Sequence, residues 1–156
     1  MTDKELIQAA KRYLNKVPQT DRLIARLKST IATLRAGLTS QSYDLKPDKV
    51  QTSGPTDTLA ETFARIDELE REIQQDIADL NNWKKDTYSR IEHLEGLDQR
   101  NILIARYIEG KQWEKIAVEL NFSIRQVHRI HGIGLIAFAE KNMEILKDGT
   151  QCHTDL

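Results

Sequence analysis

The chain has 156 residues, of which 30% are charged and 6% are aromatic, and its formal net charge is −1. This length allows about one domain, or one small domain with an extended element, and leaves little room for an active-site cleft. The composition favours long solvated helices, so we expect an all-α fold. A net charge near zero excludes a uniformly basic nucleic-acid-binding arm, so any contact with DNA has to come from a local face.

The N-terminal part of the chain predicts two helices and a loop. The first helix covers about residues 2–16, and Pro18 then interrupts its apolar spacing. A second helix over Asp21–Arg35 ends at Gly37. Its apolar stripe is formed by Ile24, Leu27, Ile31 and Leu34. Residues 37–58 concentrate Gly, Pro, Ser, Thr and Asp without periodicity, which predicts a flexible loop.

A long helix is predicted from Leu59 onward, because its apolar residues share one heptad seam. The seam consists of Leu59, Phe63, Ile66, Ile73, Ile77, Leu80, Ile91 and Leu94. One narrow stripe cannot be buried by a single helix. The helix therefore packs against Asp21–Arg35 in a structural hairpin, or pairs with a second copy of the chain, or does both. Residues 1–95 are thus predicted as a coiled-coil platform, whose seam length favours a homo-oligomer.

Beyond Gly96 the periodicity changes and predicts three shorter helices, over Asp98–Glu109, over Gln112–Leu120 and from Ser123 onward. The last two have the inner apolar corner of a helix-turn-helix, formed by Ile116, Leu120, Phe122, Val127 and Ile130. Ala117 is small where the two helices would cross. We expect Asn121 to take the left-handed backbone conformation that the turn requires. The module is predicted over residues 96–147, with a disordered tail at 148–156.

The segment from Arg100 to Phe138 resembles region four of bacterial sigma factors, the module that reads a promoter's upstream element. The residues that match this pattern are Tyr107, Gly110, Trp113, Ile116, Ala117, Leu120, Ser123, Val127, Ile130 and Leu135. The whole layout, with a loop that reads DKVQTSG, resembles small phage-encoded regulators of late transcription in the ArpU and RinA group. The resemblance implies a phage or prophage transcription regulator that binds double-stranded DNA, with RNA polymerase as a second candidate partner.

Helix geometry predicts which residues of the third short helix would touch DNA. If Val127 and Ile130 face inward, the outward residues near its N-terminus are Ile124, Arg125, His128 and Arg129. Arginine can bind guanine in the major groove, Gln126 could bind adenine, and Ile124 could contact a thymine methyl group. The family geometry adds phosphate contacts by Lys111 and Lys115, which flank the preceding helix. No acidic residue lies between Asn121 and Ala139, which indicates a local basic face.

The sequence gives little indication of metal binding, catalysis or cofactor binding. His128 and His131 have no carboxylate or thiolate beside them, so no metal site is predicted. We expect no enzymatic activity and no cofactor, because phosphate-binding loops, nucleophile elbows and carboxylate clusters are missing. Gly132 and Gly134 are expected to allow close packing or a bend in the third short helix.

The compartment is predicted from the N-terminus and from Cys152. Cys152 is the single cysteine, the sequence MTDKELIQ lacks the apolar core of a signal peptide, and no apolar run reaches the ~18 residues of a membrane span. We therefore expect a cytoplasmic protein without a membrane partner. Two alternative functions remain open: a small terminase subunit that marks viral DNA for packaging, and an adaptor that binds RNA polymerase without touching DNA.

Overall fold

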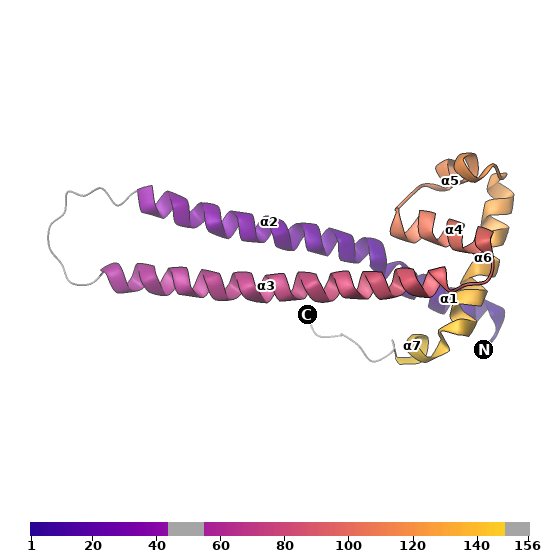
Figure 1. The fold of residues 1–156 in the computed structure, drawn as a ribbon, viewed down its shortest axis with the longest axis horizontal. Helices are drawn as coiled ribbons and strands as arrows, with labels where there is room; N and C mark the ends of the chain where they lie inside the picture. Colours follow the sequence, from indigo (N-terminus) through magenta and orange to yellow (C-terminus); the bar gives the residue numbers. More distant parts are fainter. Residues whose placement is uncertain (44–54, 149–156) are drawn as a thin grey trace. The chain divides into compact units, whose positions relative to one another are not determined.

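The computed structural model describes residues 1–43 and 55–148, and within these ranges the regular structure is entirely helical (Figure 1). This confirms the all-α fold class. The elements are α1 (Asp3–Leu14), α2 (Lys16–Tyr43), α3 (Pro55–Glu92), α4 (Leu97–Leu103), the π-helical turn η1 (Ile104–Ile108), α5 (Trp113–Leu120), α6 (Ile124–Lys141) and α7 (Met143–Asp148). No helix in the described ranges is long and apolar enough to cross a membrane.

The break between the first two helices lies at Asn15 and not at Pro18. Helix α1 starts with a capping box: Thr2 N–H donates to the Glu5 carboxylate at 2.7 Å, and the Thr2 hydroxyl accepts from Glu5 N–H at 3.4 Å. Pro18 falls in the first turn of α2, where backbone N–H groups have no partner within the helix. Proline is tolerated there, so the second helix begins earlier than the sequence predicts.

The prediction of a flexible loop over residues 37–58 is wrong at both of its ends, which are helical. Helix α2 continues through Gly37 to Tyr43, because a single glycine weakens a helix by only about 1 kcal/mol relative to alanine. Helix α3 begins at Pro55, and proline is favoured at the first helical position. The rest of the predicted loop, residues 44–54, lies outside the described residues. So does the predicted tail from residue 149, whereas Asp148 still belongs to α7.

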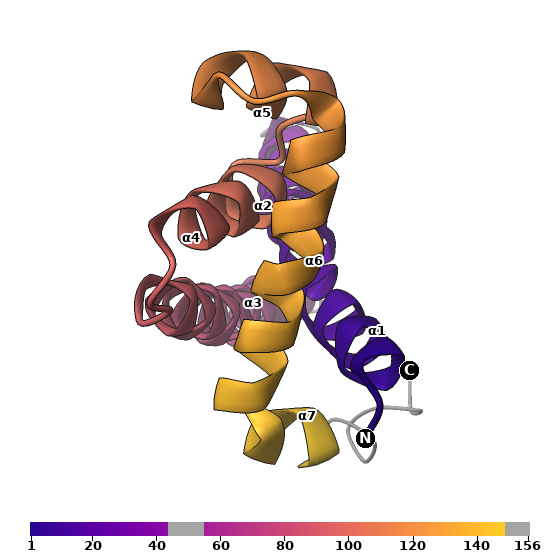
Figure 2. The same ribbon diagram turned by 90° about the vertical axis from the view of Figure 1, so that its right-hand side faces the viewer.

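The chain divides into two compact units at boundaries that differ from the predicted one near residue 95. The terminal unit joins Met1–Thr20 to the chain from Trp83 onward, and the helix-pair unit is Asp21–Asn82. Figure 2 shows α1 beside the second half of α6. The core between them contains Leu6, Ala10, Leu14, Ile91, Leu94, Leu135, Phe138 and Ala139. Because α1 and the end of α3 supply much of this core, they belong with the terminal unit and not with a separate platform.

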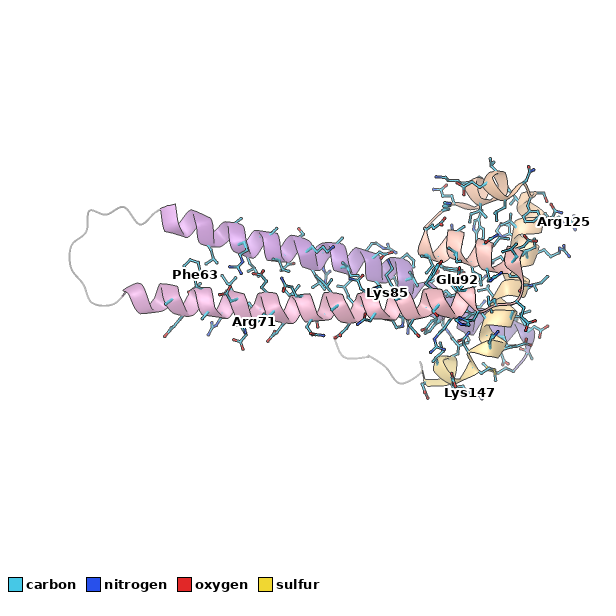
Figure 3. All side chains as sticks on the ribbon, viewed as in Figure 1. Phe63, Arg71, Lys85, Glu92, Arg125 and Lys147 are labelled. Carbon is cyan, nitrogen blue, oxygen red and sulfur yellow. The ribbon has the colours of Figure 1, made fainter. Side chains whose placement is uncertain are left out.

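In the helix-pair unit, α2 and α3 run antiparallel (Figure 1). Arg35 of α2 donates to Asp67 at 2.8 Å and to Glu70 at 2.6 Å. The heptad seam stays partly exposed: Phe63 is 36% exposed, and the partly buried members are Ile66, Ile73, Ile77 and Leu80. Side chains between the two helices therefore cover only part of the seam (Figure 3).

Candidate functional site

The candidate site is built on α5, α6 and the three residues that join them. Asn121 has φ 61° and ψ 37°, the left-handed conformation predicted for the turn. Ser123 caps α6: its hydroxyl accepts from Gln126 N–H at 3.2 Å, and the Gln126 side-chain oxygen accepts from Ser123 N–H at 3.0 Å. These local bonds fix where α6 begins and how it leaves α5.

A small apolar core holds the two helices together. It consists of the buried residues Ile102, Ala105, Ile116, Ala117 and Val127, with Trp113, Leu120, Phe122 and Ile130 packed against it. The inward positions predicted from the sequence are therefore confirmed. Val127 is fully buried, so positions half a turn away around the helix face solvent.

The outward face of α6 carries the predicted residues Ile124, Arg125, His128 and Arg129, all of which are exposed. Ile124, the first residue after the Ser123 cap, is 46% exposed. Arg125 projects away from the terminal unit (Figure 3). Arg125 and Arg129 form no hydrogen bond or ion pair with any residue in the described ranges. Their guanidinium groups are thus available to a ligand.

Gln126 also lies on α6, but its side chain is engaged in the cap. Its amide oxygen accepts from both Ser123 N–H and the Ser123 hydroxyl, the latter at 3.2 Å. A bidentate bond to adenine needs both the oxygen and the nitrogen of this amide. Gln126 could therefore contact adenine in that way only by giving up the cap.

The two lysines predicted at phosphates differ in their surroundings. Lys111 Nζ lies 2.5 Å from the Glu109 carboxylate and 2.7 Å from the Glu119 carboxylate. Hydrogen bonds to Glu109 and Glu119 raise the pKa of Lys111. Lys115 on α5 is exposed. Two carboxylates compensate the charge of Lys111, which leaves Lys115 as the stronger candidate for a phosphate contact.

Behind the exposed face lies a cluster of rings around Trp113 that the sequence did not reveal. The Arg106 guanidinium lies 4.4 Å from the centre of the Trp113 ring, a cation–π distance. The rings of His128 and His131 lie 4.6 and 4.7 Å from the same ring. Arg106 reaches this place from η1, and it also donates to the Lys111 carbonyl at 3.0 Å. No local residue pattern signals a π-helical turn, so this contact could not be predicted.

His131 is buried, and its Nε2 atom shares a hydrogen bond of 3.0 Å with the Tyr107 hydroxyl. Burial, and then the charge of Lys11 on α1, lower the pKa of His131 to about 4. Burial raises the pKa of Tyr107 to about 12. Neutral His131 and the protonated Tyr107 hydroxyl therefore share a hydrogen bond between uncharged groups, whose direction depends on the imidazole tautomer, and the pair supports the fold. In the described ranges no three His, Cys, Asp or Glu residues gather as a metal site would require.

Comparison with known proteins adds no relative: no family model, no curated protein and no solved structure matches the chain. The function has to be inferred from the chemistry of the terminal unit. The distinctive feature of this unit is the exposed face at the start of α6, where Arg125 and Arg129 project from a helix that Ser123 caps.

Proposed function

We propose that the chain is a DNA-binding transcription regulator of a phage or prophage, in which α5 and α6 form a helix-turn-helix. In this proposal α6 enters the major groove of duplex DNA by its N-terminal end. The carrying observation is the face formed by Arg125, His128 and Arg129, which is exposed, free of acidic residues and held by the Ser123 cap. Such a face suits a polyanion whose base edges offer acceptors.

Sequence preference would come from the first two turns of α6. Arg125 and Arg129 lie one turn apart, so both can reach base edges along one groove. Each arginine can donate two hydrogen bonds to O6 and N7 of a guanine. Ile124 would contact a thymine methyl group. Gln126 serves the cap and thereby sets the angle of the helix.

Affinity without sequence preference would come from Lys115, whose exposed ammonium group lies on α5. Lys111 would contribute less, because Glu109 and Glu119 already bind it.

The helix-pair unit would join two chains. Its partly exposed seam gives a second copy an apolar stripe to cover, and a dimer would present two helix-turn-helix modules to two half-sites. RNA polymerase is a second proposed partner, because residues 100–138 resemble region four of bacterial sigma factors.

In the first step of the test, the full chain selects the duplexes that it binds from a random library. Fluorescence anisotropy then measures its affinity for the selected duplex and for a scrambled one. Arg125→Ala and Arg129→Ala should each weaken the selected complex by about 1–3 kcal/mol and relax the preference at one base pair. Arg71→Ala is the matched control, since Arg71 is an exposed arginine on α3. If all three variants bind alike, α6 does not read DNA, and the adaptor hypothesis replaces this one.

A further inference from the structure

Gly132 lies in the middle of α6 although the fold does not require a glycine there. Among the described glycines, a positive φ occurs at Gly110 and not at Gly132. A Cβ atom built on Gly132 would have no neighbouring atom within 4 Å. Glycine within a helix is nevertheless less favourable than alanine. The residue thus lowers helix stability without any packing benefit inside the terminal unit.

Gly134, on the same helix, does have close neighbours that leave little room for a side chain. A Cβ there would lie 3.4 Å from Gln99 Cβ and 3.5 Å from the Leu103 side chain. Gly134 is buried against α4, so the close packing expected from the sequence applies to it. Close packing is wrong for Gly132, because a Cβ there would meet no atom within 4 Å.

Helix geometry places Gly132 on the proposed DNA face. It follows Arg125, His128 and Arg129 by seven, four and three residues, so the four positions share one side of α6. It lies eight residues beyond Ile124, which is about 12 Å along the axis at ~1.5 Å per residue. The major groove is ~12 Å wide. A helix whose first residues touch base edges would therefore reach the edge of the groove near Gly132.

We propose that α6 crosses the sugar-phosphate backbone of duplex DNA at Gly132, where the missing side chain lets a phosphodiester group approach the helix. This rests on the proposed function and deepens it, because the contact would set how far α6 enters the groove. Arg129, which precedes Gly132 by one turn, supplies positive charge on this side of the helix. A methyl group at position 132 would hold the phosphate away from the helix.

The experiment compares Gly132→Ala with Gly37→Ala. Gly37 likewise lies within a helix, α2, and a Cβ there would also have no neighbour within 4 Å. Both variants should raise Tm by roughly 2 °C, because alanine favours the helix. Only Gly132→Ala should weaken binding of the selected duplex, by about fivefold. Gly132→Leu should weaken it further while the helix stays folded.

Two results would overturn the proposal. Wild-type affinity in both position-132 variants would mean that no backbone approaches there. A lower Tm for Gly132→Ala would mean that the fold itself requires the glycine. If Arg125→Ala and Arg129→Ala lose affinity while Gly132→Ala does not, only this inference fails. If the arginine variants and Gly132→Ala all bind like the wild type, or the wild type binds no duplex, the proposed function fails with it.

Discussion

The hydroxyl of Tyr107 lies 3.0 Å from Nε2 of His131, and this hydrogen bond links η1 to α6 beneath the exposed arginines. The histidine ring also packs edge-on against Trp113, with 4.7 Å between ring centres. Because burial keeps His131 neutral, the bond depends on pH. The packing beneath the proposed DNA face thus depends on the protonation state of His131, which is itself buried.

We expect the chain to lose stability between pH 6.5 and pH 4. Unfolded His131 binds a proton near its ordinary pKa of 6.5, whereas folded His131 does so only at about 4. The unfolded state therefore takes up more protons in this window, and the free energy of unfolding falls as the pH falls, by up to about 3 kcal/mol. Urea titrations of the wild type and of His131→Asn measure the effect. His93→Asn is the control, since His93 is exposed.

The variant His131→Asn should show a smaller loss over this window than the wild type, while His93→Asn should follow the wild type. Parallel curves for all three proteins would contradict the assignment to His131.

Gln126→Ala should act on stability more than on base preference. The side chain accepts from Ser123 N–H, so its loss removes half of the capping box and should cost about 1 kcal/mol. Ser123→Ala should cost a similar amount by removing the other half. Thermal unfolding measures both variants. If Gln126→Ala leaves Tm unchanged and instead relaxes the preference for one adenine, Gln126 reads a base.

Lys115→Gln should weaken binding of selected and scrambled duplexes alike and reduce the salt slope by about one. Lys111→Gln should reduce the slope by less, because Glu109 and Glu119 already compensate that ammonium group. Lys85→Gln is the control, with the same loss of charge at an exposed position of α3. Anisotropy titrations at several salt concentrations provide the slopes. Equal slopes for the Lys115 and Lys85 variants would exclude a phosphate contact at Lys115.

A dimer is expected through the seam of the helix-pair unit. Ile73 and Ile77 remain partly exposed on α3, and a second copy would cover them. Sedimentation equilibrium at roughly tens of micromolar should show two chains, and Ile73→Lys should shift the equilibrium towards one chain. Glu72→Lys is the control on an exposed neighbouring position. A wild-type monomer, with and without DNA, would be incompatible with this seam as the interface.

Local structure around the candidate site follows from the sequence by itself. Ser123 with Gln126 determines the start of α6, and Asn121 supplies the left-handed turn before it. Each feature depends on residues within three or four positions, so the order of residue types determines it. Helical periodicity likewise places Val127 inside and Arg125 outside, because 3.6 residues make one turn.

Only the tertiary structure decides which groups meet across the chain. Periodicity gives α1 an apolar face, but packing selects α6 as its partner, so the N-terminal helix joins the terminal unit. The same applies to Lys111, which the fold places against Glu119, and to Arg106, which η1 places over Trp113. Burial and charge compensation are sums over neighbours that different elements bring together. A pattern within one helix can therefore predict that a face will be covered, but the contacts that cover it are determined by the fold.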